Sequence, residues 1–127
     1  MMRAMGTVVL CGAFMLGASS PATAANDPKA QLKILDAAKG GATKTAWLHC
    51  GPAGGTHPHA REACRLLRAV HGKPDALNVK PQTMCTHDVA PHAVVIAGRW
   101  FGQDVSWAKV FSNACALKAA TGAVLAL

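Results

Sequence analysis

The sequence lacks the short motifs by which zinc-binding and catalytic proteins are most easily recognised. It contains five cysteines and six histidines, but no Cys-x-x-Cys and no His-x-x-x-His pair of the kind that binds zinc. Neither Ser106 nor Ser112 lies in the nucleophile-elbow context of a serine hydrolase. We therefore expect no enzyme, no metal and no other cofactor, although His57-Pro58-His59 leaves a metal-handling function open as an alternative.

Aromatic and acidic residues are both scarce. The chain has three tryptophans, three phenylalanines and no tyrosine, and its 6 acidic side chains face 13 lysines and arginines, for a net charge of +7. This charge favours encounters with acidic partners. The basic residues are spread out, with no interleaved aromatic side chains on which bases could stack, so we expect no nucleic-acid binding.

Long hydrophobic runs are also missing, apart from one short stretch near the N-terminus. Arg3 provides a basic start, residues 7–16 form the apolar run, and residues 22–24 read Ala-Thr-Ala, a typical cleavage site. The run is too short to span a bilayer. We expect a signal peptide over residues 1–24 and a secreted, extracellular domain over residues 25–127, with no membrane attachment after cleavage.

Four cysteines remain in that mature domain: Cys50, Cys64, Cys85 and Cys115. Because thiols of exported proteins tend to oxidise, this even number predicts two disulfides. Their order alone permits three pairings. If consecutive cysteines pair, the two disulfides close loops of 14 and 30 residue steps. Each would then stabilise a small domain by roughly 3 to 4 kcal/mol. Zinc binding by these thiols and the histidines is the competing interpretation.

Alternating side chains predict a β-hairpin at the start of the mature domain. Residues 31–35 alternate between apolar and polar, residues 39–41 contain the glycines that break the pattern, and residues 43–50 alternate again. Residues 51–55 are then expected to form a loop. One clear helix follows, ending at Gly72, with an apolar stripe at helical spacing: Ala60, Ala63, Cys64, Leu67 and Val70.

Three further strands are predicted in the C-terminal half, over residues 92–97, 104–111 and 123–127, with a turn at Gly98-Arg99 after the first. Residues 85–91 have no helical period and are bounded by a cysteine and a proline, which predicts an exposed, extended loop. Strands gathered around one principal helix indicate an α+β domain with a mainly antiparallel sheet.

Four motifs in these segments carry a family resemblance: Gly55-Thr56-His57-Pro58, Ala63-Cys64, Met84-Cys85 and Val110-Phe111-Ser112-Asn113. Through them the mature domain resembles, over essentially its whole length, the Streptomyces subtilisin inhibitor-like proteins, which are small secreted serine protease inhibitors. The resemblance implies a five-stranded antiparallel sheet packed against one main and one short helix, the short one near residues 116–120. It also implies a homodimer through the sheet and sequential disulfides, Cys50 with Cys64 and Cys85 with Cys115.

The resemblance implies an inhibitory loop as well. In the family, the second residue after the third cysteine is P1, which enters the primary specificity pocket of the protease. Here Cys85 becomes P3, Thr86 P2, His87 P1 and Asp88 P1′, so the reactive bond is His87–Asp88. The implied reactive-site loop comprises Cys85, Thr86, His87, Asp88 and Val89, with Pro91 and Asn113 in support. Asn113 is either a brace that hydrogen-bonds the loop or an ordinary turn residue.

The residues at this bond depart from the family pattern, in which P1 is usually apolar or basic and P2 is commonly proline. His87 has neither the apolar bulk that suits a subtilisin pocket nor the reach that a trypsin-like pocket needs, and Asp88 places a charge beside the bond. We expect an inhibitor whose partner is a secreted serine protease. Two alternatives stay open: inhibition of another protease class, and a secreted binding or metal-handling protein on the same scaffold.

Overall fold

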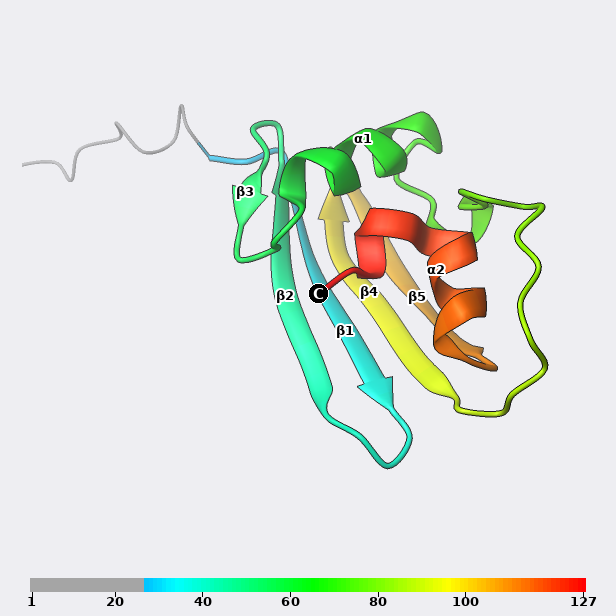
Figure 1. Ribbon diagram of the computed structural model, residues 1–127. Coiled ribbons are helices and arrows are strands. Elements are labelled where there is room, and N and C mark those ends of the chain that lie inside the picture. Colours follow the sequence, from blue (N-terminus) through cyan, green and yellow to red (C-terminus); the bar gives the residue numbers. More distant parts are fainter. Residues whose placement is uncertain (1–26) are drawn as a thin grey trace, which may run out of the picture.

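Five antiparallel strands form one sheet, and both α-helices cover the same face of it (Figure 1). The computed structural model describes residues 27–127, so the predicted signal peptide lies outside the described residues. The strands are β1 (Ala30–Ala38), β2 (Thr43–Cys50), β3 (Gly54–Gly55), β4 (His92–Trp100) and β5 (Gln103–Phe111), in the order β3-β2-β1-β4-β5. The predicted fold class is confirmed.

The helices are α1 (Ala60–Ala69) and α2 (Ala114–Thr121), with 3₁₀ helices η2 (Pro74–Ala76) and η3 (Gly122–Leu125). The first matches the predicted apolar stripe, because Ala63, Cys64 and Leu67 are buried. The second is the short helix that the resemblance implied. Within residues 27–127, none of these helices is long and apolar enough to cross a membrane.

The strand predicted over residues 123–127 is wrong. Gly122 has a φ of 54°, which ends α2 and turns the chain into η3, where Val124 and Leu125 are buried. A short apolar run has no period that separates a buried strand from a buried helical turn. The fifth strand is instead β3, which lies in the predicted loop over residues 51–55 and pairs with Leu48 and His49 of β2.

The predicted turn at Gly98-Arg99 is also wrong, since β4 continues through both residues to Trp100. Gly98 serves a different purpose there: a Cβ at this position would overlap the carbonyl oxygen of Gln31 on β1. The glycine therefore permits a close approach between neighbouring strands. The turn comes three residues later, at Phe101 and Gly102, which both have positive φ as a two-residue type I′ hairpin requires.

The core lies between the helices and the inner face of the sheet. Inner and outer positions alternate along each long strand, so that Leu32 and Ile34 of β1 are fully buried while Lys33 between them is exposed. The buried residues from the other elements include Leu48, Leu67, Val94, Ile96, Leu117 and Val124. The Cys50–Cys64 disulfide fastens β2 to α1 within this core.

The outer face of the sheet carries no helix and is rich in apolar side chains. Trp47 is 45% exposed and Val110 is 65% exposed. The apolar residues that the register places on this outer face are Leu35, Ala37, Trp47, Ala93, Val95, Ala97, Ala108 and Val110. Exposed apolar residues gathered on one face are characteristic of an interaction site.

A buried histidine joins the start of α1 to the C-terminal segment. His57 is 6% exposed, and its Nε2 donates to the Val124 carbonyl at 2.9 Å while its Nδ1 accepts from the His59 amide at 2.9 Å. This arrangement requires the neutral ring. Burial lowers the pKa of His57, the nearby His59 lowers it further, and the hydrogen bond to Val124 opposes both. His57, the first residue of the His57-Pro58-His59 motif, therefore links the start of α1 to the C-terminal segment.

The lowered pKa of His57 predicts that the free energy of unfolding falls on acidification. A histidine whose pKa is lowered by folding stabilises the fold fully above its unfolded value, about pH 6.5, and this contribution is lost as the pH falls through the lower folded value. We expect the free energy of unfolding to decrease below about pH 6.5. His57→Gln should reduce that decrease and cost about 1 to 3 kcal/mol at pH 8.

Denaturant unfolding between pH 5 and 8 measures both effects. His87→Gln is the matched control, because it removes an exposed histidine. An identical pH dependence in His57→Gln and in the parent would contradict this role.

Candidate functional site

The predicted reactive-site loop is an exposed segment that runs beside α2. Residues 83–91 have no regular secondary structure, and the segment passes along the outside of α2 before entering β4 (Figure 1). Met84 is 96% exposed and Val89 is 82% exposed. Apolar side chains this exposed are not held by the core, so the backbone conformation of the loop depends on specific anchors.

The approach to the loop is fixed to α2. The amide of Val79 donates to the Ala120 carbonyl at 3.1 Å, and the amide of Lys80 donates to the Ala119 carbonyl at 2.8 Å. Cys85 is then joined to Cys115 in the first turn of α2. Both disulfides thus have the pairing that the resemblance implied. The second one ties the loop to the helix directly before the predicted reactive bond.

Asn113 holds the loop on both sides of that bond. Its Nδ2 donates to the carbonyl oxygens of Thr86 and Asp88, each at 3.0 Å. Its Oδ1 accepts from the amide of Ala116 at 2.8 Å and so caps the N-terminus of α2. The side chain is 6% exposed. One buried amide therefore couples the helix to the backbone on either side of His87, which agrees with the brace and not with the ordinary turn residue.

The exit from the loop is anchored at three points. The amide of Ala90 donates to the Ser112 carbonyl at 2.8 Å, and the Pro91 carbonyl accepts from the Lys39 amide at 2.9 Å. The next residue, His92, pairs with Asp36 of β1 through Nδ1 and Oδ1, 2.8 Å apart. Sequence analysis missed Ser112 and the Asp36–His92 pair as loop supports. Pro91 lies where it was predicted, at the end of the loop.

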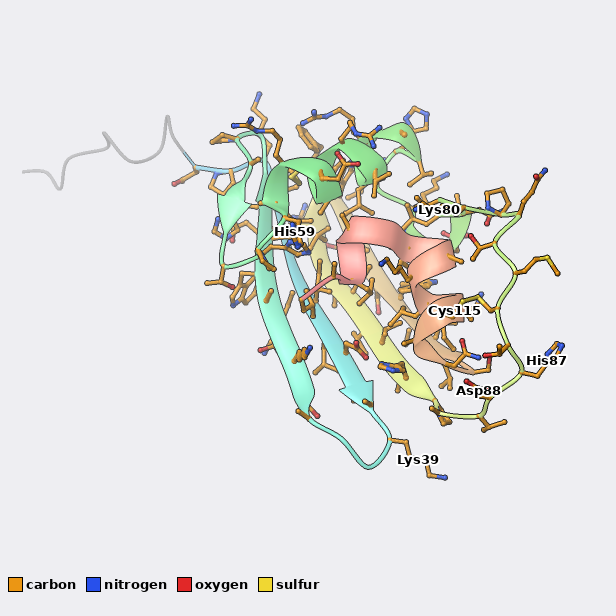
Figure 2. The ribbon with its side chains drawn as sticks, viewed as in Figure 1. Lys39, His59, Lys80, His87, Asp88 and Cys115 are labelled. Atoms are coloured by element: carbon orange, nitrogen blue, oxygen red, sulfur yellow. A yellow bond between two sulfur atoms is a disulfide. The ribbon has the colours of Figure 1, made fainter. Side chains whose placement is uncertain are left out.

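The peptide between these anchors is presented to solvent. His87 points away from the domain, and Asp88 follows it in the same exposed loop (Figure 2). Among residues 27–127, no hydrogen-bond donor engages the carbonyl oxygen of His87. The flanking carbonyls are held by Asn113 while this one is open to an approaching group. Such a geometry suits an extended segment that binds in the cleft of another protein.

The residues that the structure describes give little support to the metal-binding alternative. All four cysteines within residues 27–127 are in disulfides, so none of them can be a thiolate ligand. No group of three or more histidine, cysteine, aspartate or glutamate side chains within residues 27–127 is placed to hold a metal ion.

Comparison with known proteins identifies the family of the chain. A family model described as subtilisin inhibitor-like matches residues 29–113, which include Cys50, Cys64, Cys85 and the whole loop. The chain belongs to the subtilisin inhibitor-like family. The match ends at Asn113, the residue that braces the loop.

Relatives within the subtilisin inhibitor-like family are named as protease inhibitors. The subtilase-type protease inhibitor of Streptomyces coelicolor is 38% identical over 125 residues, which cover 91% of this chain and 86% of that relative. The transglutaminase-activating metalloprotease inhibitor of Streptomyces mobaraensis is 40% identical over 90 residues, covering 69% and 61%.

A solved protein structure has the same fold. Sermetstatin of Streptomyces caespitosus, crystallised in complex with Bacillus licheniformis subtilisin, superposes with a TM-score of 0.61 at 27% identity. The alignment covers 77% of this chain and 98% of sermetstatin.

Proposed function

We propose that the chain is a secreted inhibitor of subtilisin-like or related serine endopeptidases, with His87–Asp88 as its reactive bond. The observation that carries this proposal is the bracing of both neighbouring carbonyls by Asn113. The family membership and the subtilisin bound to sermetstatin support it. The roles P3 to P1′ for Cys85, Thr86, His87 and Asp88 are part of the proposal.

The proposed mechanism is that of a substrate held too firmly to become product. The loop adds an extended strand to the binding edge of the protease and presents the His87 carbonyl carbon to the catalytic serine. Because the disulfide and Asn113 have already ordered the loop, little conformational entropy is lost on binding. The same anchors resist the separation of the two chain ends that completes hydrolysis.

Incubation of the mature protein with a panel of serine proteases and metalloproteases tests this function. We expect stoichiometric inhibition of a subtilisin-type enzyme and, on long exposure, a single cut between His87 and Asp88. Rapid degradation at several bonds, or a first cut elsewhere, would contradict the proposed loop.

Asn113→Asp separates the brace from the helix cap. A carboxylate still accepts from the Ala116 amide, but it cannot donate to Thr86 and Asp88. We expect a lower unfolding midpoint, because two hydrogen bonds are lost and a carboxylate is placed at a buried position beside two carbonyl oxygens. At a temperature where the variant is folded, the cut at the reactive bond should be at least about tenfold faster. Asn113→Gly, which keeps neither function, controls for loss of the cap. Equal cutting of the parent and Asn113→Asp would show that Asn113 does not brace the loop.

A second candidate function is inhibition of a metalloprotease. It is favoured by the S. mobaraensis relative, whose name describes a metalloprotease inhibitor, and by the unusual residues at the proposed P1 and P1′. The metalloprotease arm of the same panel decides between the two functions.

We propose that the outer face of the sheet forms a homodimer. Its exposed apolar residues, among them Val95 and Val110, gain most by burial against a second copy. Val95→Lys should convert the dimer to a monomer in sedimentation equilibrium. Met84→Lys introduces the same charge on the exposed loop and should leave the dimer intact. The proposal would be contradicted if the parent stayed monomeric when its concentration in the sedimentation experiment was raised about 100-fold.

We also propose that residues 1–24 direct export and are removed, which leaves residues 25–127 as the inhibitor domain. N-terminal sequencing of the secreted protein tests the cleavage site.

A further inference from the structure

Two side chains in an unfavourable backbone conformation line the same surface hollow. His71 has a φ of 56° and Phe101 a φ of 45°, and within residues 27–127 they alone among non-glycine residues have positive φ. This conformation favours glycine or asparagine and is strained for a bulky side chain. The hollow measures about 430 Å³ and lies between the end of α1 and the β4–β5 turn. We call it the terminal hollow; Arg68, His71, Lys73, Trp100, Phe101 and Gln103 line it.

The walls of the terminal hollow are rigidly joined. Gly72, at the end of α1, packs so closely on Trp100 that a Cβ there would overlap the indole ring. Trp100 is buried, and Phe101 stacks edge-on against it with ring centroids 5.1 Å apart. The amide of Phe101 also donates to the Lys29 carbonyl at 2.9 Å. The hollow is thus formed before any ligand arrives, while 43% of Phe101 remains exposed.

The terminal hollow presents positive charge. Arg68 and Lys73 are exposed, and in the described part of the chain neither forms an ion pair. The nearest acidic side chain on the β4–β5 hairpin is Asp104, which is paired with Arg99 at 3.0 Å. The last carbonyls of α1 are occupied too, because those of Leu67 and Arg68 accept from the amides of residues 72 and 71.

We propose that the terminal hollow binds an acidic segment of a partner protein. An apolar or aromatic residue of that segment would lie on Phe101, and its carboxylates would approach Arg68 and Lys73. Exposed aromatic rings beside arginine are typical of the energetically dominant residues in protein interfaces. The hollow is open to solvent, unlike the enclosed clefts that bury most of a small molecule. Its charge complements an acidic partner.

The position of the terminal hollow makes this site separate from the proposed reactive loop. The nine residues of β4 lead from His92, at the foot of the loop, to Trp100, at the hollow. A strand of that length spans about 25 to 30 Å. A protease on the loop and an acidic partner at the hollow would therefore occupy opposite ends of the sheet.

A designed peptide tests the proposal without any protease. The probe is a capped pentapeptide with one phenylalanine between two pairs of glutamates, titrated at low salt into the isotopically labelled mature protein. We expect amide NMR shifts in residues 68–73 and 100–103 and none in residues 84–90. Arg68→Gln and Lys73→Gln should each weaken binding about fivefold to tenfold. Lys39→Gln, at the far turn of the sheet (Figure 2), should not weaken it.

Phe101→Asn separates binding from folding. Asparagine is favoured at this turn position, so the unfolding midpoint should stay the same or rise while binding of the peptide falls at least about tenfold. An unchanged affinity of Phe101→Asn would overturn the proposal. So would equal binding of a probe with alanine in place of phenylalanine, shifts scattered over all surface lysines, or tighter binding of adenosine monophosphate than of the peptide.

Discussion

His87→Leu is expected to tighten inhibition of a subtilisin-type protease by about 2 to 4 kcal/mol, which is roughly 30-fold to 1000-fold in the inhibition constant. The side chain at this position is exposed and points away from the domain (Figure 2), so the substitution should leave the fold intact. Leucine fills an apolar specificity pocket, whereas an imidazole leaves it partly empty and brings polar nitrogens into it.

Inhibition constants of the parent and of His87→Leu, measured against the same subtilisin-type enzyme, test this gain. His87→Gln is the matched polar control and should inhibit no better than the parent. If His87→Leu inhibits no better than the parent, the assigned P1 is wrong.

Replacing Cys85 and Cys115 by serine should turn a slowly cut inhibitor into a readily cut substrate. This disulfide joins Cys85, the proposed P3 residue, to the first turn of α2, and without it the loop gains freedom on one side of the proposed reactive bond. The variant should also lose about 3 to 4 kcal/mol of stability, as expected for a bridge that closes a loop of this length. The measurement is the rate of the cut at His87–Asp88, at a temperature where circular dichroism shows the variant to be folded.

The other disulfide supplies the control for this experiment. Cys50 and Cys64 join β2 to α1 at a distance from the loop, and their replacement should destabilise the fold by a comparable amount. It should not accelerate the cut while the protein stays folded. Equal acceleration in both double variants would mean that general loosening, and not the loop anchor, controls cleavage.

Local patterns in the sequence predicted the elements whose pattern is unambiguous. The alternation over residues 43–50 predicted β2, and the helical stripe predicted α1. The apolar residues 123–127 have no such period, so the sequence could not tell a strand from the buried 3₁₀ helix that forms there. Gly98 was misread because a glycine signals a turn and a close strand contact equally well.

The site was predictable to a different extent. The family resemblance placed the loop and its disulfide, and an amide beside the last cysteine suggested a brace. The two hydrogen bonds from Asn113 reach residues 25 and 27 positions away, and Asp36 and His92 are 56 positions apart. Contacts of that range depend on how α2 and the strands pack, which no local pattern contains.

The anchors on both sides of the reactive bond have a consequence for a chain that has been cut there. Thr86 and Asp88 would still share the amide of Asn113, Cys85 would still be bound to Cys115, and Ala90 would still donate to the Ser112 carbonyl. The new carboxylate and amine would therefore remain neighbours at a high effective concentration. Under the proposed function, resynthesis of the peptide bond would compete with release, and one molecule would be nicked and resealed repeatedly without being consumed.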